Sequence, residues 1–319
     1  MRDSDGGDTP AVMVVGSTMI DMVAYTDRVP AAAETVHGRS FSLGFGGKGA
    51  NQGVMARRLG ASVAMVTCLG DDVFAEMTLE NFGAEGLDTT HVHCASGVSS
   101  GVAPIWVEPD GTNRIIIVAG ANERLTPDQA RTAVTSAPRV DVVLSQFELP
   151  QDVTAAGFTA ARERGAVTVL NPAPAAEIRT DLLAVTDWLV PNEVEFAHLA
   201  RLAGVAVGDG SISDSAISAV ADALGVRLVV TLGGAGAALV GADGVRRVPA
   251  PQVEAVDTTG AGDAFVGALA YALAAGLAEL DAVRLGCACA SASVTQPGTQ
   301  SSFPAGEQLA TLRRELAAT

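Results

Sequence analysis

The stretch DTTGAGDAFVGALAYAL, residues 257–273, joins a glycine-rich turn to a long run of small apolar residues. Gly260, Ala261 and Gly262 come directly before this run, which predicts a helix over residues 262–276. Backbone N–H groups at the start of a helix form an anion site, and the absence of side chains lets a phosphate approach closely. The stretch therefore predicts a phosphate-binding turn at a helix N-terminus.

Asp263 follows the glycine turn and falls in the first turn of the predicted helix. The helix dipole favours its ionised form there by roughly 0.3–1 kcal/mol. The carboxylate is then ready to accept a proton from a substrate hydroxyl. The alternative is that Asp263 caps the helix. Because a cap alone does not need two flanking glycines, we interpret Asp263 as a general base.

Apolar runs and helical stretches alternate along most of the chain. Buried strands are predicted at residues 11–17, 61–70, 139–146, 165–171, 186–192 and 226–234. Helices are predicted at residues 48–60, 73–84, 126–136, 152–164, 193–203, 213–225, 262–276 and 279–294. This alternation indicates an α/β fold, with a doubly wound, mostly parallel sheet and helices on both faces. Since no long linker, charge block or internal repeat divides the sequence, we expect one domain over residues 1–319.

Two segments do not fit this alternation. Residues 101–120 hold two strand-like runs around PDGT, a turn signal, and residues 22–43 hold further strand-like pieces without a clear helix. We expect a small antiparallel sheet, built from about residues 18–45 and 97–119, to project from the main sheet.

The charge balance excludes several classes of partner. The chain has 20 basic and 36 acidic residues, a formal net charge of −16, which disfavours binding to nucleic acid or to an anionic membrane surface. The longest apolar run, residues 264–278, falls short of the roughly 20 residues that span a bilayer. Residues 1–10 are acidic and polar, unlike a signal peptide. We therefore expect a cytoplasmic protein.

The cysteines and histidines give no clear metal or disulfide pattern. The four cysteines have neither disulfide-framework nor zinc-site spacing. His91 and His93 could ligate a metal, but alternation on a strand explains their spacing equally well.

Polar residues or glycine follow several predicted strands, namely Glu148, Asn171, Asn192 and Gly233. In an open parallel sheet, ligands bind outside the carboxyl ends of the strands. We expect these residues to line that edge, although Asn and Gly are also ordinary loop residues.

A second glycine cluster, GFGGKG at residues 44–49, contains Lys48, the only lysine of the chain. The cluster matches the GxGxxG pattern, but it does not follow the first predicted strand, as a dinucleotide fingerprint would. It also has Gly49 where a Walker-type loop needs Ser or Thr. We interpret Gly46 and Gly47 as a hinge, and Lys48 as a compact cation in a crowded polar site. The alternative is that a single lysine is an accident of composition.

The two clusters, in this order and at this spacing, resemble the signatures of the ribokinase-like (PfkB) carbohydrate kinases. GFGGKGANQGVMARRLGA is similar to the first signature and DTTGAGDAFVGAL to the second. NPAP (171–174), PNEVE (191–195), TLGGAG (231–236) and GTQSSFP (298–304) also fall where ribokinases carry similar stretches. The resemblance runs from about Val12 to Pro304 and is closest to the ribokinases.

The resemblance implies an ATP-dependent kinase that phosphorylates the 5-hydroxyl of D-ribose. Asp263 would be the base, and the backbone of Gly260, Ala261, Gly262 and Asp263 the anion hole for the γ-phosphoryl group. The sugar would be surrounded by Met19, Asp21, Gly46, Gly47, Lys48, Asn51 and Glu148. The projecting strands would close over it as a lid, and two lids would pack together in a homodimer.

The resemblance also implies where the cofactors bind. Asn192 and Glu195 would organise Mg²⁺ and the phosphates through water, and Thr231 and Gly233 would contact ATP. A K⁺ ion would lie beside the anion hole, near Asp257, Thr259, Ser293, Gln296, Gly298 and Ser302, several of them acting through backbone carbonyls.

Met19 departs from the ribokinase pattern. That pattern often reads Gly-Ser-x-Asn-x-Asp in the first sugar loop, whereas this chain reads GSTMID. A thioether replaces an amide that could bond a sugar hydroxyl. A 2-deoxyribose kinase, or another sugar or nucleoside kinase, is therefore an alternative to a ribose kinase. A non-catalytic sugar sensor and a nucleotide-dependent oxidoreductase are alternatives from other classes.

Overall fold

The computed structural model describes residues 9–208 and 212–317. Residues 1–10 were interpreted above as unlike a signal peptide, and all but the last two of them lie outside the described residues. The described strands form two sheets, and the larger has the order β13-β12-β11-β10-β9-β8-β1-β4-β5. Its strands are β1 (Ala11–Val15), β4 (Ser62–Leu69), β5 (Asp88–Cys94), β8 (Val142–Gln146), β9 (Val167–Asn171), β10 (Trp188–Leu189), β11 (Arg227–Thr231), β12 (Ala237–Gly241) and β13 (Gly244–Val248).

The larger sheet is parallel from β5 through to β11, which confirms the expected fold class. The hairpin β12–β13 adds an antiparallel edge, and β5 forms the other edge; neither edge was among the predicted strands. The predicted strand at 186–192 shortens to the two residues of β10. The chain leaves the sheet there because Asn192 caps the next helix.

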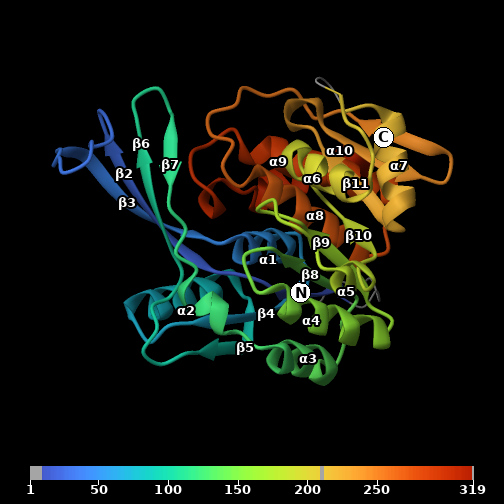
Figure 1. The fold of residues 1–319 in the computed structure, drawn as a ribbon, viewed down its shortest axis with the longest axis horizontal. Coiled ribbons are helices and arrows are strands. Elements are labelled where there is room, and N and C mark those ends of the chain that lie inside the picture. The colour runs from blue at the N-terminus through green and yellow to red at the C-terminus, as the bar shows by residue number, and fades with distance from the viewer. Residues whose placement is uncertain (1–8, 209–211, 318–319) are drawn as a thin grey trace.

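Helices cover both faces of this sheet (Figure 1). They are α1 (Lys48–Arg58), α2 (Val73–Glu85), α3 (Pro127–Ser136), α4 (Gln151–Glu163), α5 (Thr180–Leu183), α6 (Glu193–Leu202), α7 (Asp214–Leu224), α8 (Ala261–Ala274), α9 (Glu279–Ser293) and α10 (Gly306–Ala317), with 3₁₀ turns η1 (Gly120–Arg124), η2 (Gly233–Ala235) and η3 (Gln300–Ser302). The eight predicted helices are confirmed to within two residues at each end, whereas α5 and α10 were not predicted. No described helix has both the length and the apolar composition to cross a bilayer.

The central strand β1 shows why the sheet must be covered on both sides. Val12 and Val14 belong to a core formed with α1, α8 and α9, while Met13 and Val15 belong to a second core formed with α3, α4, α6 and α7. Successive side chains of a strand point to opposite faces, so an apolar run without alternation needs two apolar layers around it.

Helices α1 and α8 pack closely because glycine stands at their contact. A Cβ on Gly267 would lie 2.4 Å from the carbonyl oxygen of Gln52 and 2.9 Å from Cβ of Met55. No other residue type fits without moving one helix away from the other. The first turn of α8 is thereby held against the buried face of α1.

The smaller sheet projects from one side of the larger one (Figure 1). It contains β2 (Met19–Thr26), β3 (Gly38–Gly46), β6 (Val102–Val107) and β7 (Asn113–Ile115) in the order β3-β2-β6-β7. The pairs β2–β3 and β6–β7 are antiparallel, as expected, and β2–β6 is parallel. The GxGxxG stretch spans the end of β3 and the start of α1, so it does not occupy the turn after β1 where a dinucleotide fingerprint belongs.

Candidate active site

Asp263 lies in the first turn of α8, and its side chain does not cap the helix. The N-cap is Gly260, with φ of 76° and no side-chain cap. The carboxylate instead accepts hydrogen bonds from Asn51 Nδ2 and Gln52 Nε2, each at 2.9 Å. Asp263 is 7 % exposed. The first N–H groups of α8 have no helical partner, so the carboxylate stands beside donors that can receive an anion.

A network of buried amides fixes this carboxylate. Gln52 Nε2 also donates to Asn171 Oδ1 at 3.1 Å, and Gln146 Nε2 donates to Gln52 Oε1 at 2.6 Å. Asn171 Nδ2 donates to the carbonyl oxygen of Val190 at 2.8 Å. Gln52 and Gln146 are almost fully buried, and buried amides need partners.

Gln52 and Gln146 were not predicted as site residues from the sequence. A signal for Gln52 was present, since it stands four residues after Lys48 on α1 and so shares its face. Gln146 gave no such signal, because it reads only as the last residue of an apolar strand.

Glu148 joins the start of α1 to the loop after β1. Its Oε2 accepts from Ser17 Oγ at 2.5 Å and from the backbone N of Lys48 at 2.9 Å. Burial raises the pKa of Glu148 above its ordinary value, and the Lys48 charge opposes that rise. Glu148 therefore lies where the sequence analysis expected it, at the carboxyl edge of the sheet.

Asp21 lies on β2 against the glycines of the second cluster. A Cβ on Gly46 would be 2.3 Å from Asp21 Oδ1, so only glycine leaves room for this carboxylate. Gly47 has φ of 87°, and a Cβ there would meet the backbone of Thr18 at 2.6 Å. Burial, followed by the charges of Glu148 and Asp263, raises the pKa of Asp21 to about 7.

Lys48 is a half-buried cation among these carboxylates. Burial by itself lowers its pKa, but the charges of Asp263, Glu148 and Glu195 together raise the pKa above its ordinary value. Lys48 therefore remains an ammonium group and balances part of the local negative charge. This position supports the interpretation of the single lysine as a member of the site.

Asn192 and Glu195 form a capping box at the start of α6. Asn192 Oδ1 accepts from the N–H of Glu195 at 2.9 Å, while the backbone N and Nδ2 of Asn192 donate to the two oxygens of Glu195 at 2.8 and 2.9 Å. Glu195 is 6 % exposed, and burial raises its pKa. The two residues therefore stabilise the start of α6 and also line the site.

Two cavities meet at this edge of the sheet. The first, about 180 Å³, is lined by Lys48, Asn192, Glu195, Gly260 and Asp263, among others. The second, about 350 Å³, is more apolar and is lined by Gly233, Val253, Phe265, Cys287 and Val294, among others. Thr231 and Gly262 line both. A polar cavity joined to an apolar one suits a ligand with phosphates at one end and a flat ring at the other.

The loop expected to hold a monovalent cation is organised by Asp257. Its Oδ1 accepts from the N–H of Thr259 and its Oδ2 from the N–H of Gly298, each at 2.9 Å. Despite burial, these bonds lower the pKa of Asp257, which is therefore ionised. The hydroxyls of Ser293 and Ser302 donate to carbonyls of their own turns.

Several predicted residues do not line the first cavity, among them Met19, Asp21, Gly46, Gly47, Asn51, Glu148 and Gln296. Gln296 is exposed, and Met19 is 3 % exposed on the same face of β2 as Asp21. Among the described residues, no group of three or more His, Cys, Asp and Glu side chains could hold a metal ion, His91 and His93 on β5 included.

Known proteins are similar to this chain in sequence and fold. The family model described as pfkB family carbohydrate kinase matches residues 9–306. A deoxyribokinase of Salmonella typhi is 38% identical over 93% of this chain and 96% of its own length. A ribokinase of Mus musculus is 39% identical over 92% of each chain. The structure of Arabidopsis thaliana ribokinase complexed with ribose and ATP superposes with a TM-score of 0.84 at 29% identity, over 96% of this chain and 99% of that one.

The raised pKa of Asp21 predicts a pH-dependent stability difference. The folded protein keeps a proton on Asp21 up to about pH 7, while the unfolded chain releases it near the ordinary value of 3.8. The contribution of protonated Asp21 to the free energy of unfolding is thus complete below pH 3.8 and is lost as the pH rises to about 7. We expect Asp21→Asn to raise the melting temperature above wild type by more at pH 8 than at pH 5, in thermal unfolding followed by circular dichroism. The exposed Asp222→Asn serves as the control exchange, and a constant difference for Asp21→Asn would contradict this.

The position of Lys48 predicts that arginine cannot replace it. Gly47 and Gly49 on either side are packed against the backbone of residues 16–19, and a planar fork is larger than an ammonium group. We expect Lys48→Arg to lower kcat/KM by about tenfold or more, because the larger guanidinium group would displace the ligand and the neighbouring carboxylates. Steady-state kinetics, with the exposed Arg201→Lys as the control exchange, decides this. Wild-type kinetics for Lys48→Arg would make the single lysine an accident of composition.

Proposed function

Because this chain belongs to the pfkB family of carbohydrate kinases, we propose that it transfers the γ-phosphoryl group of ATP to the 5-hydroxyl of D-ribose. The observation that carries the proposal is the pair of amide hydrogen bonds that hold the Asp263 carboxylate at the uncapped start of α8. A kinase needs this combination, a base beside donors for the transferring group. The mouse ribokinase and the Arabidopsis ribokinase bound to ribose and ATP support the choice of sugar and phosphate donor.

In this mechanism the sugar lies between the small sheet and α1. Asp21 and Glu148 form hydrogen bonds with its hydroxyls, and Lys48 balances the charge of Glu148. Gly46 and Gly47 leave room for the sugar and for the backbone to move. Asn51 lies between the sugar and Asp263, to which it already donates.

Asp263 accepts the proton of the 5-hydroxyl while that oxygen attacks the γ-phosphorus. The N–H groups of Gly260, Ala261, Gly262 and Asp263 stabilise the negative charge on the transferring group. The adenine ring occupies the apolar cavity beside Gly233, and Thr231 lies where the two cavities meet. ADP and ribose 5-phosphate are the products.

The donor set at the site fits the two cations that this chemistry uses. Both oxygens of Glu195 already accept from Asn192, so these residues would hold Mg²⁺ through its water shell rather than directly. Mg²⁺, when bound with ATP, neutralises phosphate charge. The ionised Asp257, with the backbone carbonyls near Thr259, Ser293, Gln296, Gly298 and Ser302, would hold K⁺ beside the anion hole.

We assign the small sheet as a lid that excludes water from the closed site. The face of the small sheet opposite Asp21 supports a homodimer, because Phe41 and Leu43 on β3 lie on that face and are 59% and 45% exposed. Apolar patches of this kind mark contact sites. Since ATP is the phosphate donor, we place the reaction in the cytoplasm.

Removal of the base tests the function. We expect Asp263→Asn to fold and to bind ATP, but to lose about 10²–10⁴-fold in kcat, as general bases typically contribute. The assay is ADP release in the presence of D-ribose, with ATP binding measured by calorimetry. A folded variant with near-normal turnover would remove Asp263 from the mechanism.

The environment of Met19 favours 2-deoxy-D-ribose as a second substrate. Met19 shares the face of β2 with Asp21 and is buried, so an apolar side chain lies next to the proposed sugar site. The 38% identity to a deoxyribokinase supports the same substrate. A site without an amide there has no buried polar group left unpaired by a missing hydroxyl.

We expect Met19→Asn to shift the preference toward ribose by about 0.5–1.5 kcal/mol, the net value of one neutral hydrogen bond. The measurement is kcat/KM for ribose and 2-deoxyribose with both proteins. If the wild type excludes 2-deoxyribose by several orders of magnitude, or the ratio is the same in both proteins, Met19 does not face the 2-position.

A further inference from the structure

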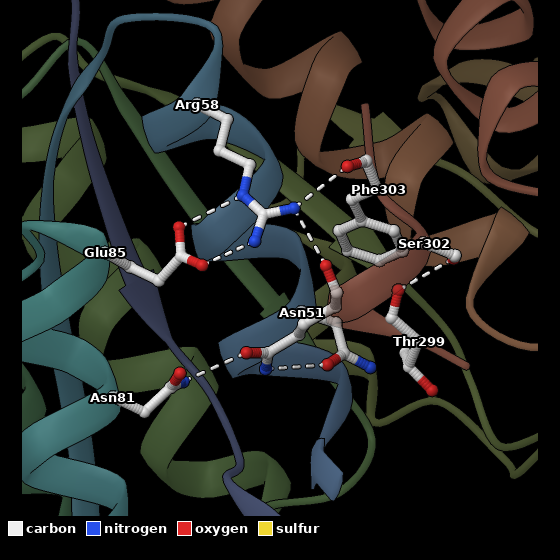
Figure 2. Close-up of polar contacts among 8 residues, drawn as sticks. Asn51, Arg58, Asn81, Glu85, Thr299, Ser302 and Phe303 are labelled. Atoms are coloured by element: carbon white, nitrogen blue, oxygen red, sulfur yellow. Dashed lines mark hydrogen bonds and ion pairs between the residues drawn. The ribbon is translucent and has the colours of Figure 1, made fainter. Parts of the chain in front are cut away.

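Three amides form a hydrogen-bonded chain that runs from α2 to Asp263. Asn81 Nδ2 donates to Gln300 Oε1 at 3.0 Å, and Gln300 Nε2 donates to Asn51 Oδ1 at 3.0 Å. Asn51 Nδ2 in turn donates to Asp263 Oδ2 at 2.9 Å. Figure 2 shows the Asn81 and Asn51 ends of this chain beside η3. Gln300 and Asn51 are 6 % and 5 % exposed.

The hydrogen bonds of these three amides all run in one direction, toward Asp263. Gln300 and Asn51 each accept on the side-chain oxygen and donate from the nitrogen, and the last acceptor is a carboxylate, which can only accept when ionised. Because Gln300 donates to the oxygen of Asn51, it fixes which way that amide points. A reversed Asn51 would place its oxygen against the carboxylate of Asp263 and repel the ionised form.

Arg58 holds the segment that carries Gln300. Its Nη1 donates to the carbonyl oxygens of Gln300 at 2.8 Å and Phe303 at 3.0 Å, at the two ends of η3 (Figure 2). Its other edge forms a bidentate ion pair with Glu85 on α2. The Arg58 and Glu85 side chains are 17% and 20% exposed, and paired, partly buried hydrogen bonds of this kind are among the strong ones.

The same segment also supports the proposed anion hole. A Cβ on Gly260 would lie 2.6 Å from Cγ2 of Thr299 and 3.2 Å from Cε1 of Phe303, so the residues flanking η3 pack directly against the turn before α8. One clamped segment therefore contacts both the base, through Gln300 and Asn51, and the glycine turn.

We propose that Asn81, Gln300 and Arg58 are positioning residues, which keep the amide of Asn51 directed at Asp263 and so keep Asp263 ionised as a base. The proposal rests on the function assigned to Asp263 above. None of the three residues touches substrate. The charged groups that face Asp263 are Lys48, Asp21, Glu148 and Glu195, and the variants below keep all four. Arg58→Lys tests the position of the amides without adding a carboxylate, whereas Gln300→Glu and Asn81→Asp each add one.

Two nearly isosteric substitutions test the direction of the chain. Glutamate at position 300 has no donor for Asn51 Oδ1 and instead accepts from Asn51 Nδ2, so Gln300→Glu reverses the Asn51 amide. We expect kcat to fall about tenfold or more, sugar and ATP KM to change by less than about threefold, and the acid limb of the kcat–pH profile to move up by about one unit. Asn81→Asp reverses Gln300 from farther away and should give the same change, but smaller.

The exposed Gln308→Glu adds the same charge on α10 and serves as the control, with no expected shift of the profile. Arg58→Lys keeps the charge but cannot bridge two carbonyls and Glu85, so its effect on kcat should not add to that of Gln300→Glu. The same shift should appear in the titration of the Asp263 carboxyl, followed by ¹³C NMR of aspartate-labelled protein. The NMR titration needs no turnover. A wild-type protein that phosphorylates no sugar would therefore contradict the proposed function, but not the positioning role proposed here.

An unmoved pH profile and titration in folded Gln300→Glu would overturn the proposal. The proposal would also be overturned if kcat fell only in proportion to a lower melting temperature, because the three residues would then have a purely structural role. If Gln300→Glu does not fold, the kcat–pH profile and the NMR titration of Asn81→Asp test the proposal instead.

Discussion

The close contact between α1 and α8 is the constraint on which the rest of the site depends. Gly267 lets α8 lie against the carbonyl oxygen of Gln52. The first turn of α8 then reaches Asn51 and Gln52, and Asp263 accepts from both across more than 200 residues of sequence. A larger residue at position 267 would separate the base from its donors and move the glycine turn away from the sugar side of the site.

The electrostatics of the site follow from this contact. The charges of Glu148, Glu195 and Asp263 all act on one lysine, so the site carries a net negative charge before any ligand enters. A neutral sugar with many hydroxyls suits such acceptors. The phosphate end needs positive potential, which the start of α8 supplies locally and Mg²⁺ would supply when bound. An acidic chain can therefore bind an anionic nucleotide without a basic surface.

Local patterns predicted the fold and the position of the proposed base Asp263, but not the interactions that orient its carboxylate. Apolar runs identified the strands of the parallel sheet, and the glycine turn before a small-residue helix identified Asp263. The edge strands β13 and β5 were not predicted, because half-exposed edge strands carry a weak apolar signal. The strand β12 was not predicted either, although its first three residues are buried. The partners Gln52, Gln146 and Gln300 lie on three separate elements, so only tertiary packing shows that they meet. The family resemblance named Asn51 as a sugar contact, and the structure adds that its side-chain amide donates to Asp263.

The central claim is that this site moves a phosphoryl group from ATP to a pentose. The most direct measurement is ADP release with Mg²⁺ and K⁺ over a panel of pentoses, hexoses and nucleosides, with the product identified by mass spectrometry and ³¹P NMR. We expect ADP release that requires D-ribose or 2-deoxy-D-ribose and yields one sugar 5-phosphate per ADP. Folded protein that releases no sugar-dependent ADP with either pentose, or that phosphorylates only a hexose or a nucleoside, would contradict the account.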